Sequence, residues 1–432
     1  MRVLVISRGP AGSRRSAPGI RARAMARVLA EQLPGIEVTL AVPDHPDLPD
    51  GPYFTERAVG ARLSDLARRQ DVVISMGLPL VALPAALSSH FVLDYFANFY
   101  VEWMLGTGRA PAGLRRRARR DGDRWYLNLQ LTLADYILCA TESQRDAYLG
   151  ALAGLGLIYP DSFRRDHSLR ALIDVAPHGV RFEPSPTRDR SWLQQRIPGL
   201  SDDEPVLLWN SGIVEWYDPR TAIRATGLLR AEGIPAHLVF VGGPYPGGDN
   251  TGAHEHRAAA RYADELGLLD TAVHFLDGWL PYREVPQVLA GADLAVCTWR
   301  RTLEARYALR TRYLDLLWAR VPLIATAGDP FGDLMASRGA LAPVPEDDAT
   351  AVARACAALL ADRERRAAVT TAMATLADEL RWERTLAPLV RHLSGGARPT
   401  AMPKHLRLPG MAARLTGTLA WRAVDAVGRW QG

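Results

Sequence analysis

The residues best suited to chemistry stand together in one short stretch of the second half of the chain. Glu304 follows a predicted strand, and Asp315 comes three residues after Arg312. Arg310, Thr311 and Arg312 stand where a helix is expected to begin, so Arg312 and Asp315 should share a helix face or lie side by side. Guanidinium groups at a helix start can hold a diphosphate, and two carboxylates can accept hydrogen bonds from the hydroxyls of a ribose and a sugar. This pattern suits a nucleoside diphosphate sugar.

A structural role would explain the same residues. Arg312 and Asp315 could form an ion pair within the helix on a solvated face, which would add little to stability. Because the residue types and their spacing fit both roles about equally well, both interpretations stay open on the sequence alone.

A glycine-containing loop, SRGPAGSRRSAPGIR (7–21), follows the first predicted strand. Gly12 and Gly19 would let the backbone approach a ligand, and the helix that starts there favours an anion. Asp44 follows the second strand, where a ribose-binding acid would be expected in a dehydrogenase. The glycine spacing is not the one that binds dinucleotides, so a dehydrogenase is disfavoured. A flexible surface loop is the alternative interpretation.

A second loop, LLWNSGIVEWYDP (207–219), follows the first strand of the second half. Asn210, Ser211 and Gly212 are expected to form a turn whose backbone amides could bind phosphate oxygens. Asp218 precedes a helix, where it could simply cap the N-terminus. The two roles are compatible.

Short apolar runs alternate with helical patterns through most of the chain, and these elements must position the loops. Runs of this length without polar alternation predict parallel strands buried on both faces. Helices between such strands predict doubly wound sheets, which bind ligands outside the carboxyl ends of their strands. The first series of runs is at 2–7, 37–42, 71–75, 91–94, 136–140 and 173–177, and the second is at 205–210, 237–242, 272–276, 294–298 and 322–326.

The sequence therefore predicts an α/β protein with two Rossmann-like, doubly wound domains that face a cleft. A basic amphipathic helix is expected after them. The expected boundaries are an N-terminal domain at 1–183, a linker at 184–204, a C-terminal domain at 205–380, a crossover helix at 381–393 and a basic tail at 394–432.

Charge excludes several classes of function. The chain has 52 Lys and Arg against 47 Asp and Glu, and the whole excess of +5 lies after residue 397. A neutral body is a poor nucleic-acid binder, so no nucleic-acid partner is expected. Lys404 is the only lysine, which excludes Schiff-base chemistry and a P-loop lysine from the body of the protein.

The cysteines and the apolar runs indicate a cytoplasmic protein. Cys139, Cys297 and Cys356 are too far apart to suggest a disulfide framework or a metal cluster, so no metal site is expected. The start of the chain shows no secretory leader. The longest apolar stretch, 72–93, is broken by glycine and proline and should not span a bilayer.

The tail has its own pattern. In residues 410–432, apolar side chains repeat mostly at helical spacing and arginines flank them. Basic amphipathic helices of this kind adsorb to anionic membrane surfaces, so a peripheral contact with the cell membrane is one expectation. Packing against the body or a second subunit is the other.

Several segments in order resemble the retaining glycosyltransferases of family 4, which have the GT-B fold, and especially an actinobacterial-type branch of them. The resemblance runs from residue 2 to about residue 393. It is carried by PGIRARAMARVLA (18–30), FVLDYFANFYVE (91–102), LCATESQRDAYLGAL (138–152), LRALIDVAPHGV (169–180), LLWNSGIVEWYDPRTAIRA (207–225), DGWLPY (277–282) and RTRYLDLLWARVPLIATAGD (310–329).

The resemblance implies roles for the second domain. Asp315 matches the acid that binds the donor ribose, and Glu304 is similar to the acid that contacts the transferred sugar. Gly212 matches the loop under the donor diphosphate. Gly278, Trp279 and Leu280 match the segment that borders the nucleobase. Trp382 and Glu383 match the final helix, which crosses back to the first domain.

Two departures from the family pattern concern the catalytic residues. The two acids of the family motif are separated by seven residues, whereas Glu304 and Asp315 are eleven positions apart. The usual Arg and Lys pair after Asn210 is missing, and Arg310 and Arg312 are the candidates to replace it, because guanidinium groups suit phosphate oxygens. Glu304, Arg310 and Arg312 are therefore the predicted catalytic set.

The resemblance also implies a mechanism and an acceptor side. Transfer would occur by front-face attack with no metal ion or other cofactor, and the departing diphosphate would take the acceptor proton. Gly12, Gly19 and Arg21 of the first loop, with Asp94 and Glu102, should border a glycan, lipid-linked or small-molecule acceptor. Alternatively, Asp94 could cap a helix and Arg21 could pair with a carboxylate. His178 is expected to be a packed hinge residue.

Two other functions fit the same fold. A nucleotide-sugar epimerase would turn over the donor without an acceptor. A protein that binds sugar nucleotides without catalysis would explain the unusual spacing of the acids.

Overall fold

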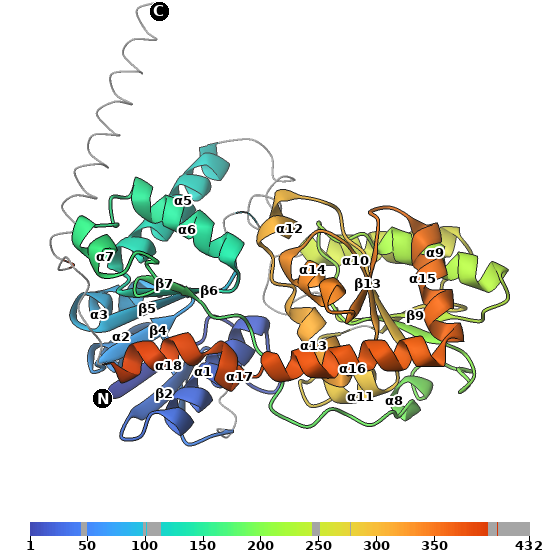
Figure 1. Cartoon of the computed structure of the whole chain (residues 1–432), viewed down its shortest axis with the longest axis horizontal. Coiled ribbons are helices and arrows are strands. Elements are labelled where there is room, and N and C mark those ends of the chain that lie inside the picture. The colour runs from blue at the N-terminus through green and yellow to red at the C-terminus, as the bar shows by residue number, and fades with distance from the viewer. Residues whose placement is uncertain are drawn as a thin grey trace, which may run out of the picture.

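The computed structural model describes residues 1–44, 50–97, 101, 114–243, 251–276, 278–395 and 404. These residues form two α/β domains side by side, as Figure 1 shows. The predicted class, two doubly wound parallel sheets, is therefore confirmed. The predicted tail helix at 410–432 and the acceptor candidate Glu102 lie outside the described residues.

The first domain is a parallel sheet with helices on both faces. The strand order is β3-β2-β1-β4-β5-β6-β7. The apolar runs explain the sheet, because β4 and β6 are buried along their whole length. The strands are β1 (Arg2–Ile6), β2 (Glu37–Val42), β3 (Phe54–Arg57), β4 (Val72–Ser75), β5 (His90–Tyr95), β6 (Tyr136–Cys139) and β7 (Ile173–Val175). The helices are α1 (Ala17–Gln32), α2 (Gly60–Arg68), η1 (Leu80–Ala82), α3 (Leu83–Ser88), α5 (Leu114–Leu133), α6 (Glu142–Gly154) and α7 (Pro160–Arg165).

The second domain repeats this architecture, with the strand order β10-β9-β8-β11-β12-β13. Its strands are β8 (Val206–Trp209), β9 (His237–Val241), β10 (Val273–Leu276), β11 (Leu294–Cys297), β12 (Leu323–Thr326) and β13 (Leu341–Val344). Its helices are α8 (Ser191–Gln194), α9 (Pro219–Ala231), α10 (Thr251–Glu265), α11 (Val285–Ala290), α12 (Leu303–Tyr307), α13 (Thr311–Ala319), α14 (Pro330–Ser337), α15 (Ala349–Ala361) and α16 (Arg363–Glu379).

Side-chain caps explain where several helices begin. Ser16 accepts a hydrogen bond from the amide of Gly19 at the start of α1, and Thr141 caps α6 in the same way. Asp218 caps α9 and Pro219 follows it, as the sequence predicted. Each cap satisfies an amide that the helix leaves unpaired.

The segment predicted as a linker, 184–204, folds largely onto the second domain. It contains α8, and Trp192 and Leu193 are buried in the core of that domain, with Ile197 and Leu200 beside them. Their apolar side chains explain the difference, because a polar, proline-containing stretch can still bury a few large residues.

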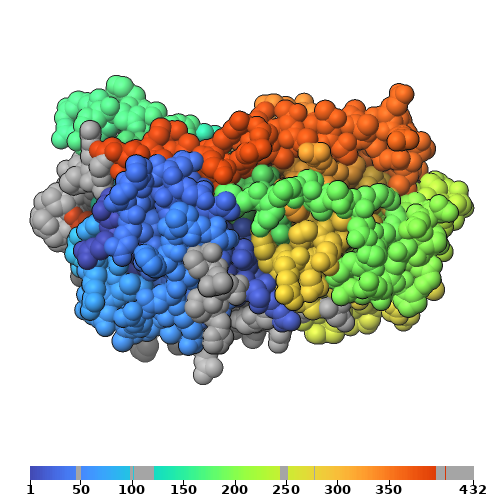
Figure 2. All heavy atoms as spheres, turned by 90° about the horizontal axis from the view of Figure 1, so that it is seen from below, coloured from blue at the N-terminus to red at the C-terminus, as the bar shows by residue number. Residues whose placement is uncertain are grey.

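The chain crosses between the domains twice. After α16, the helices α17 (Trp382–Thr385) and α18 (Ala387–Ser394) return to the first domain, where Trp382 and Leu386 join the core cluster that contains α1. Figure 2 shows this C-terminal segment, orange to red, along one edge of both domains. The two crossings are joined, since the amide of Val180 donates to the carbonyl of Leu380 at 2.9 Å. No helix among the described residues is long and apolar enough to cross a membrane.

Candidate functional site

A cavity of about 260 Å³ lies between the two domains, beside the crossing segments. It sits at the carboxyl ends of β8 and β10 and at the start of α13, the place where open parallel sheets bind ligands. It is lined by Arg15, Ala17, Ile20, His178, Gly179, Val180, Arg181, Asn210, Ser211, Gly212, Trp279, Tyr282, Thr311, Arg312, Leu314, Asp315 and Trp382. The donor-binding candidates Asn210, Ser211, Gly212, Trp279, Thr311 and Asp315 thus come together, although they are spread over more than a hundred residues.

The first turn of α13 faces this cavity through Thr311 and Arg312. The first amides of a helix have no partner within it, so this end favours an anion. Asn210 holds the turn in place, because its Nδ2 donates to the carbonyl of Arg312 at 3.1 Å. The Arg312 guanidinium lies 4.3 Å from the centre of the Tyr217 ring, and its Nη1 is buried without a hydrogen-bond partner among the described residues. Leaving a buried cationic nitrogen unpaired is costly, so this atom is suited to pair with an anion.

Glycines bring three loops of the second domain together below the cavity. A side chain at Gly242, where φ is +123°, would place its Cβ 2.8 Å from the carbonyl carbon of Ser211. Gly243 approaches Gly278 just as closely, and its amide donates to the Gly278 carbonyl at 3.2 Å. Ser211 Oγ is buried and lacks a partner within the described part of the chain. Leu280, the third residue of the predicted nucleobase segment, packs against the core of the domain.

Asp315 projects from the first turns of α13 and is bound by an arginine from the crossing segment. Nε of Arg181 donates to Oδ1 of Asp315 at 2.8 Å. The Asp315 side chain keeps 30% of its surface exposed, whereas that of Arg181 keeps 5%. The intrahelical pair with Arg312 that the sequence allowed is not formed, because Arg181 takes this position.

Two cavity residues that the sequence did not predict meet at Tyr282. The guanidinium of Arg15 lies 4.5 Å from the centre of this ring, and that of Arg181 lies 3.8 Å from it. The amide of Tyr282 also donates to the carbonyl of Ser13 across the cleft, at 2.8 Å. In the sequence Arg15 is one of several arginines in a basic loop, and nothing marks it out from its neighbours. Three arginines and one aspartate thus make the charged lining of the cavity cationic.

The predicted catalytic residues Glu304 and Arg310 lie elsewhere, in a buried cluster of their own. Nη2 of Arg310 donates to Oε2 of Glu304 at 3.1 Å, and its Nε lies 3.7 Å from Oδ2 of Asp329. The side chains of Arg310, Glu304 and Asp329 are 1%, 5% and 0% exposed. Burial raises the pKa of Asp329 to about 6, although Arg310 opposes this rise. The short helix α12 turns the Glu304 carboxylate inward, so neither Glu304 nor Arg310 lines the cavity described above.

The acceptor-side candidates are also tied into the fold. Nε and Nη2 of Arg21 donate to the two oxygens of Asp94, each at 2.7 Å, and both side chains are buried. Arg21 thus pairs with a carboxylate, as the alternative interpretation of the sequence allowed, and that carboxylate is Asp94. The amide of Gly12 donates to Asp44 at 3.0 Å, so Asp44 holds the loop. Gly19 is required where it stands, because a Cβ there would lie 1.9 Å from the carbonyl oxygen of Pro10.

His178 borders the cavity as a neutral side chain. Burial, together with the nearby charge of Arg21, lowers its pKa to about 3. Its Nδ1 donates to the carbonyl of Gly179 at 3.0 Å, while Nε2 is buried with no partner in the described ranges. Trp382 packs against His178, with the ring centres 4.5 Å apart. The predicted role as a packed hinge residue agrees with this placement.

Hydrogen bonds also join the domains at a second place, apart from the two crossing segments. There the start of α6 meets α12. Ser143 Oγ donates to the carbonyl of Arg306 at 2.9 Å, and Gln144 Nε2 donates to that of Tyr307 at 2.7 Å. The start of α6 is itself braced.

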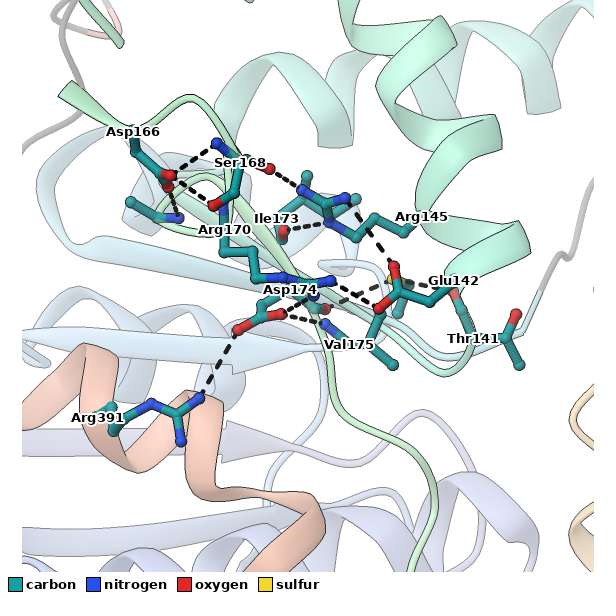
Figure 3. A network of polar contacts seen from close by, with 12 residues as sticks. Thr141, Glu142, Arg145, Asp166, Ser168, Arg170, Ile173, Asp174, Val175 and Arg391 are labelled. Atoms are coloured by element: carbon teal, nitrogen blue, oxygen red, sulfur yellow. Dashed lines mark hydrogen bonds and ion pairs between the residues drawn. The ribbon is translucent and has the colours of Figure 1, made fainter. Parts of the chain in front are cut away.

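Figure 3 shows the polar network that provides this brace, in which Arg170 lies between Asp174 and Glu142. Asp174 also lies 3.9 Å from the Arg391 guanidinium of α18, so the network reaches the crossover helix. The start of α6 is thus connected to both the second domain and the returning C-terminal segment.

Solved structures share this architecture over nearly the whole chain. HepE of Anabaena, in complex with UDP-glucose, matches with a TM-score of 0.64 at 15% identity, covering 91% of this chain and 100% of that one. Sucrose-phosphate synthase from Thermosynechococcus elongatus matches with a TM-score of 0.59 at 17% identity, covering 91% and 99%. WaaG, a glycosyltransferase involved in lipopolysaccharide biosynthesis, matches with a TM-score of 0.60 at 15% identity, covering 91% and 100%. The fold is that of the GT-B glycosyltransferases.

The sequence comparison identifies the second domain more closely. Residues 204–362 match the family Glycosyl transferases group 1, a range that contains all six strands of the second sheet. The chain therefore carries a Glycosyl transferases group 1 domain. No curated protein sequence matches the chain.

Proposed function

We propose that the protein is a retaining glycosyltransferase that binds a nucleoside diphosphate sugar in the cavity between its domains. One observation carries the proposal above the others. The buried Nη1 of Arg312 lacks a partner among the described residues and borders a cavity that also takes in the start of α13. A cation without a counterion beside a helix N-terminus suits a diphosphate.

The residues that line the cavity favour one orientation of the donor. The diphosphate would lie between Arg312 and the loop at Gly212, with Ser211 Oγ donating to a phosphate oxygen. The ribose would reach Asp315, and the base would extend toward Trp279, which borders the same cavity. HepE, which shares the fold, was solved in complex with UDP-glucose, and this supports a nucleotide-sugar donor here.

The chemistry needs few protein groups. The bond between the anomeric carbon and the diphosphate oxygen breaks, and the acceptor oxygen bonds to that carbon on the same face. The acceptor proton passes to the departing diphosphate, so atoms and charge balance with no oxidant and no metal ion. Arg312 and the dipole of α13 stabilise the charge that develops on the leaving group. The acceptor, a glycan, a lipid-linked sugar or a small molecule, would enter from the first domain on the side of Arg15.

Nucleotide binding tests this proposal directly. Purified full-length protein is titrated with UDP, ADP and GDP by calorimetry in EDTA, and transfer of the matching nucleotide sugars is followed. Arg312→Met should weaken diphosphate binding at least tenfold, because a charge-assisted hydrogen bond is lost. The matched control is Arg338→Met, since Arg338 is an exposed arginine paired with Glu379 in the same domain.

The outcomes separate clearly. Tight binding by the wild type and the control, with weak binding by Arg312→Met, supports the proposed donor site. Retention of the anomeric configuration in the product, read by NMR, supports the retaining mechanism. Equal binding by all three proteins would exclude Arg312 from the donor site, and binding of none of the nucleotides by the wild type would overturn the proposal.

A further inference from the structure

Arg181 stands where the first crossing segment, the second crossing segment and the cavity meet. Its neighbour Val180 is hydrogen-bonded to the second crossing through Leu380, at 2.9 Å. Its guanidinium lies 3.8 Å from the centre of the Tyr282 ring and 5.2 Å from that of Trp318. The backbone and the side chain of Arg181 are therefore both held in place.

The contact with Asp315 uses only one of the two carboxylate oxygens. Nε of Arg181 binds Oδ1 at 2.8 Å, while Nη1 reaches the carbonyl of Tyr282 at 3.4 Å. Within the described residues, no hydrogen bond or ion pair engages Oδ2 of Asp315, and Asp315 is one of the residues that line the cavity. The carboxylate is thus held through one oxygen, and the other oxygen is available to a ligand.

We infer that Arg181 is a positioning residue that fixes the Asp315 carboxylate for the ribose hydroxyls of the donor. This inference rests on the proposed function, because it assigns the same cavity to a nucleoside diphosphate. Arg181 acts through this carboxylate, to which its Nε donates. It fixes the orientation of the Asp315 carboxylate, and it does so from the first crossing segment. Helix α13 alone would leave a half-exposed aspartate free to change rotamer.

The inference predicts a specific loss of ribose recognition. An aspartate that binds the ribose hydroxyls discriminates between a ribonucleotide and its 2′-deoxy counterpart, because the deoxy ligand lacks one of the hydroxyls that donate to the carboxylate. Without Arg181 the carboxylate is no longer held, so this discrimination should shrink. A purely structural role for Arg181 would lower the melting temperature and leave the ratio of the two affinities unchanged.

The test measures dissociation constants of the full-length protein for UDP, ADP and GDP and for their 2′-deoxy forms. The variants are Arg181→Met, Arg181→Lys, Asp315→Asn and the double variant Arg181→Met with Asp315→Asn. The double variant removes both charges and so remains informative if Arg181→Met leaves an unpaired acid and folds poorly. Arg196→Met is the control, because Arg196 also stacks on a tryptophan, Trp192, with its guanidinium 3.7 Å from the ring centre, but lies outside the cavity.

For the nucleotide that binds best, we expect Arg181→Met to weaken ribonucleotide binding about tenfold and deoxyribonucleotide binding much less. Arg181→Lys should fall between the wild type and Arg181→Met, since an ammonium group lacks the fixed fork of a guanidinium. The double variant should bind within about twofold of Asp315→Asn, because the two residues act through one carboxylate.

Each contrary result has a distinct meaning. An unchanged ribose preference in Arg181→Met and Arg181→Lys would overturn the inference and leave the proposed function standing. Additive losses in the double variant would also overturn it. A wild-type protein that binds none of the three nucleotides would overturn the proposed function itself.

Discussion

The buried cluster around Arg310 gives the sharpest test of what holds the donor domain together. Arg310 lies between Glu304 and Asp329, at 3.1 Å and 3.7 Å, and its Nη1 donates to the Tyr217 hydroxyl at 3.3 Å. Substitution Arg310→Met keeps most of the volume but leaves two buried carboxylates without a cation. Removing one partner of a buried ion pair costs about 3–5 kcal/mol, so we expect a loss of that size at pH 7.

The pH dependence of this loss follows from Asp329. Its folded pKa is about 6, against an ordinary value of 3.8, so its contribution to stability is largest at low pH and is lost as the pH rises through 6. Arg310 lowers this pKa, and removing Arg310 should raise it further. The deficit of Arg310→Met relative to the wild type should therefore be larger at pH 8 than at pH 5.

Urea unfolding at pH 5 and pH 8, followed by circular dichroism, measures these differences. Adding Glu304→Gln to Arg310→Met should recover about 1–2 kcal/mol, because one buried charge is then removed with its partner. Arg338→Met, which breaks an exposed pair, should change the free energy of unfolding by less than about 1 kcal/mol. If Arg310→Met unfolds like the wild type at both pH values but no longer binds nucleotide, Arg310 belongs to the donor site and the structural interpretation fails.

Two other predictions concern the first domain and the hinge. Gly19→Ala should destabilise the protein by about 1–3 kcal/mol, because its Cβ would lie 1.9 Å from the Pro10 carbonyl oxygen. Gly150→Ala in α6, where a Cβ meets no atom within 4 Å, should instead be neutral or stabilising, and urea unfolding of both variants measures the difference. The folded pKa of His178 is lowered from 6.5 to about 3, so the wild type should lose about 1.4 kcal/mol per pH unit from this residue as the pH falls below 6.5. His178→Asn should flatten the fall in stability between pH 6.5 and pH 4.5, and an unchanged slope would contradict the assignment.

The sequence predicted the central strands and two of the four edge strands, β7 and β10, but it missed the other two. Runs such as 205–210 and 322–326 are buried on both faces, and an unbroken apolar run is the signature of such strands. The strands β3 and β13 lie at the edges of their sheets and were not predicted. β3 is exposed or half-buried along its length, and β13 contains Pro343, which a central strand would exclude.

Local sequence patterns predicted the residues of the candidate site that lie near strand ends and helix starts, but not their contacts with distant residues. The rule that ligands bind at the carboxyl ends of parallel strands brought Asn210, Gly212 and Arg312 to one place. The same local pattern could not separate Arg310 from Arg312, two residues apart, although one is buried in an ion cluster and the other faces the cavity. The partner of Asp315 could not be found at all, because Arg181 is 134 residues away and belongs to a different segment.

The cationic lining of the cavity is assembled from both domains and from the segment that joins them. Arg15 comes from the first domain, Arg181 from the crossing segment and Arg312 from the second domain, so neither domain alone supplies the cationic lining. At the hinge the domains are held by buried apolar groups, above all Trp382, which lies in the core of the first domain. At the start of α6 they are held by a few hydrogen bonds, each with a net contribution of about 0.5–1.5 kcal/mol. The contacts away from the crossing segments are therefore the weaker set, and the ion pair of Arg181 with Asp315 ties α13 to the crossing segments.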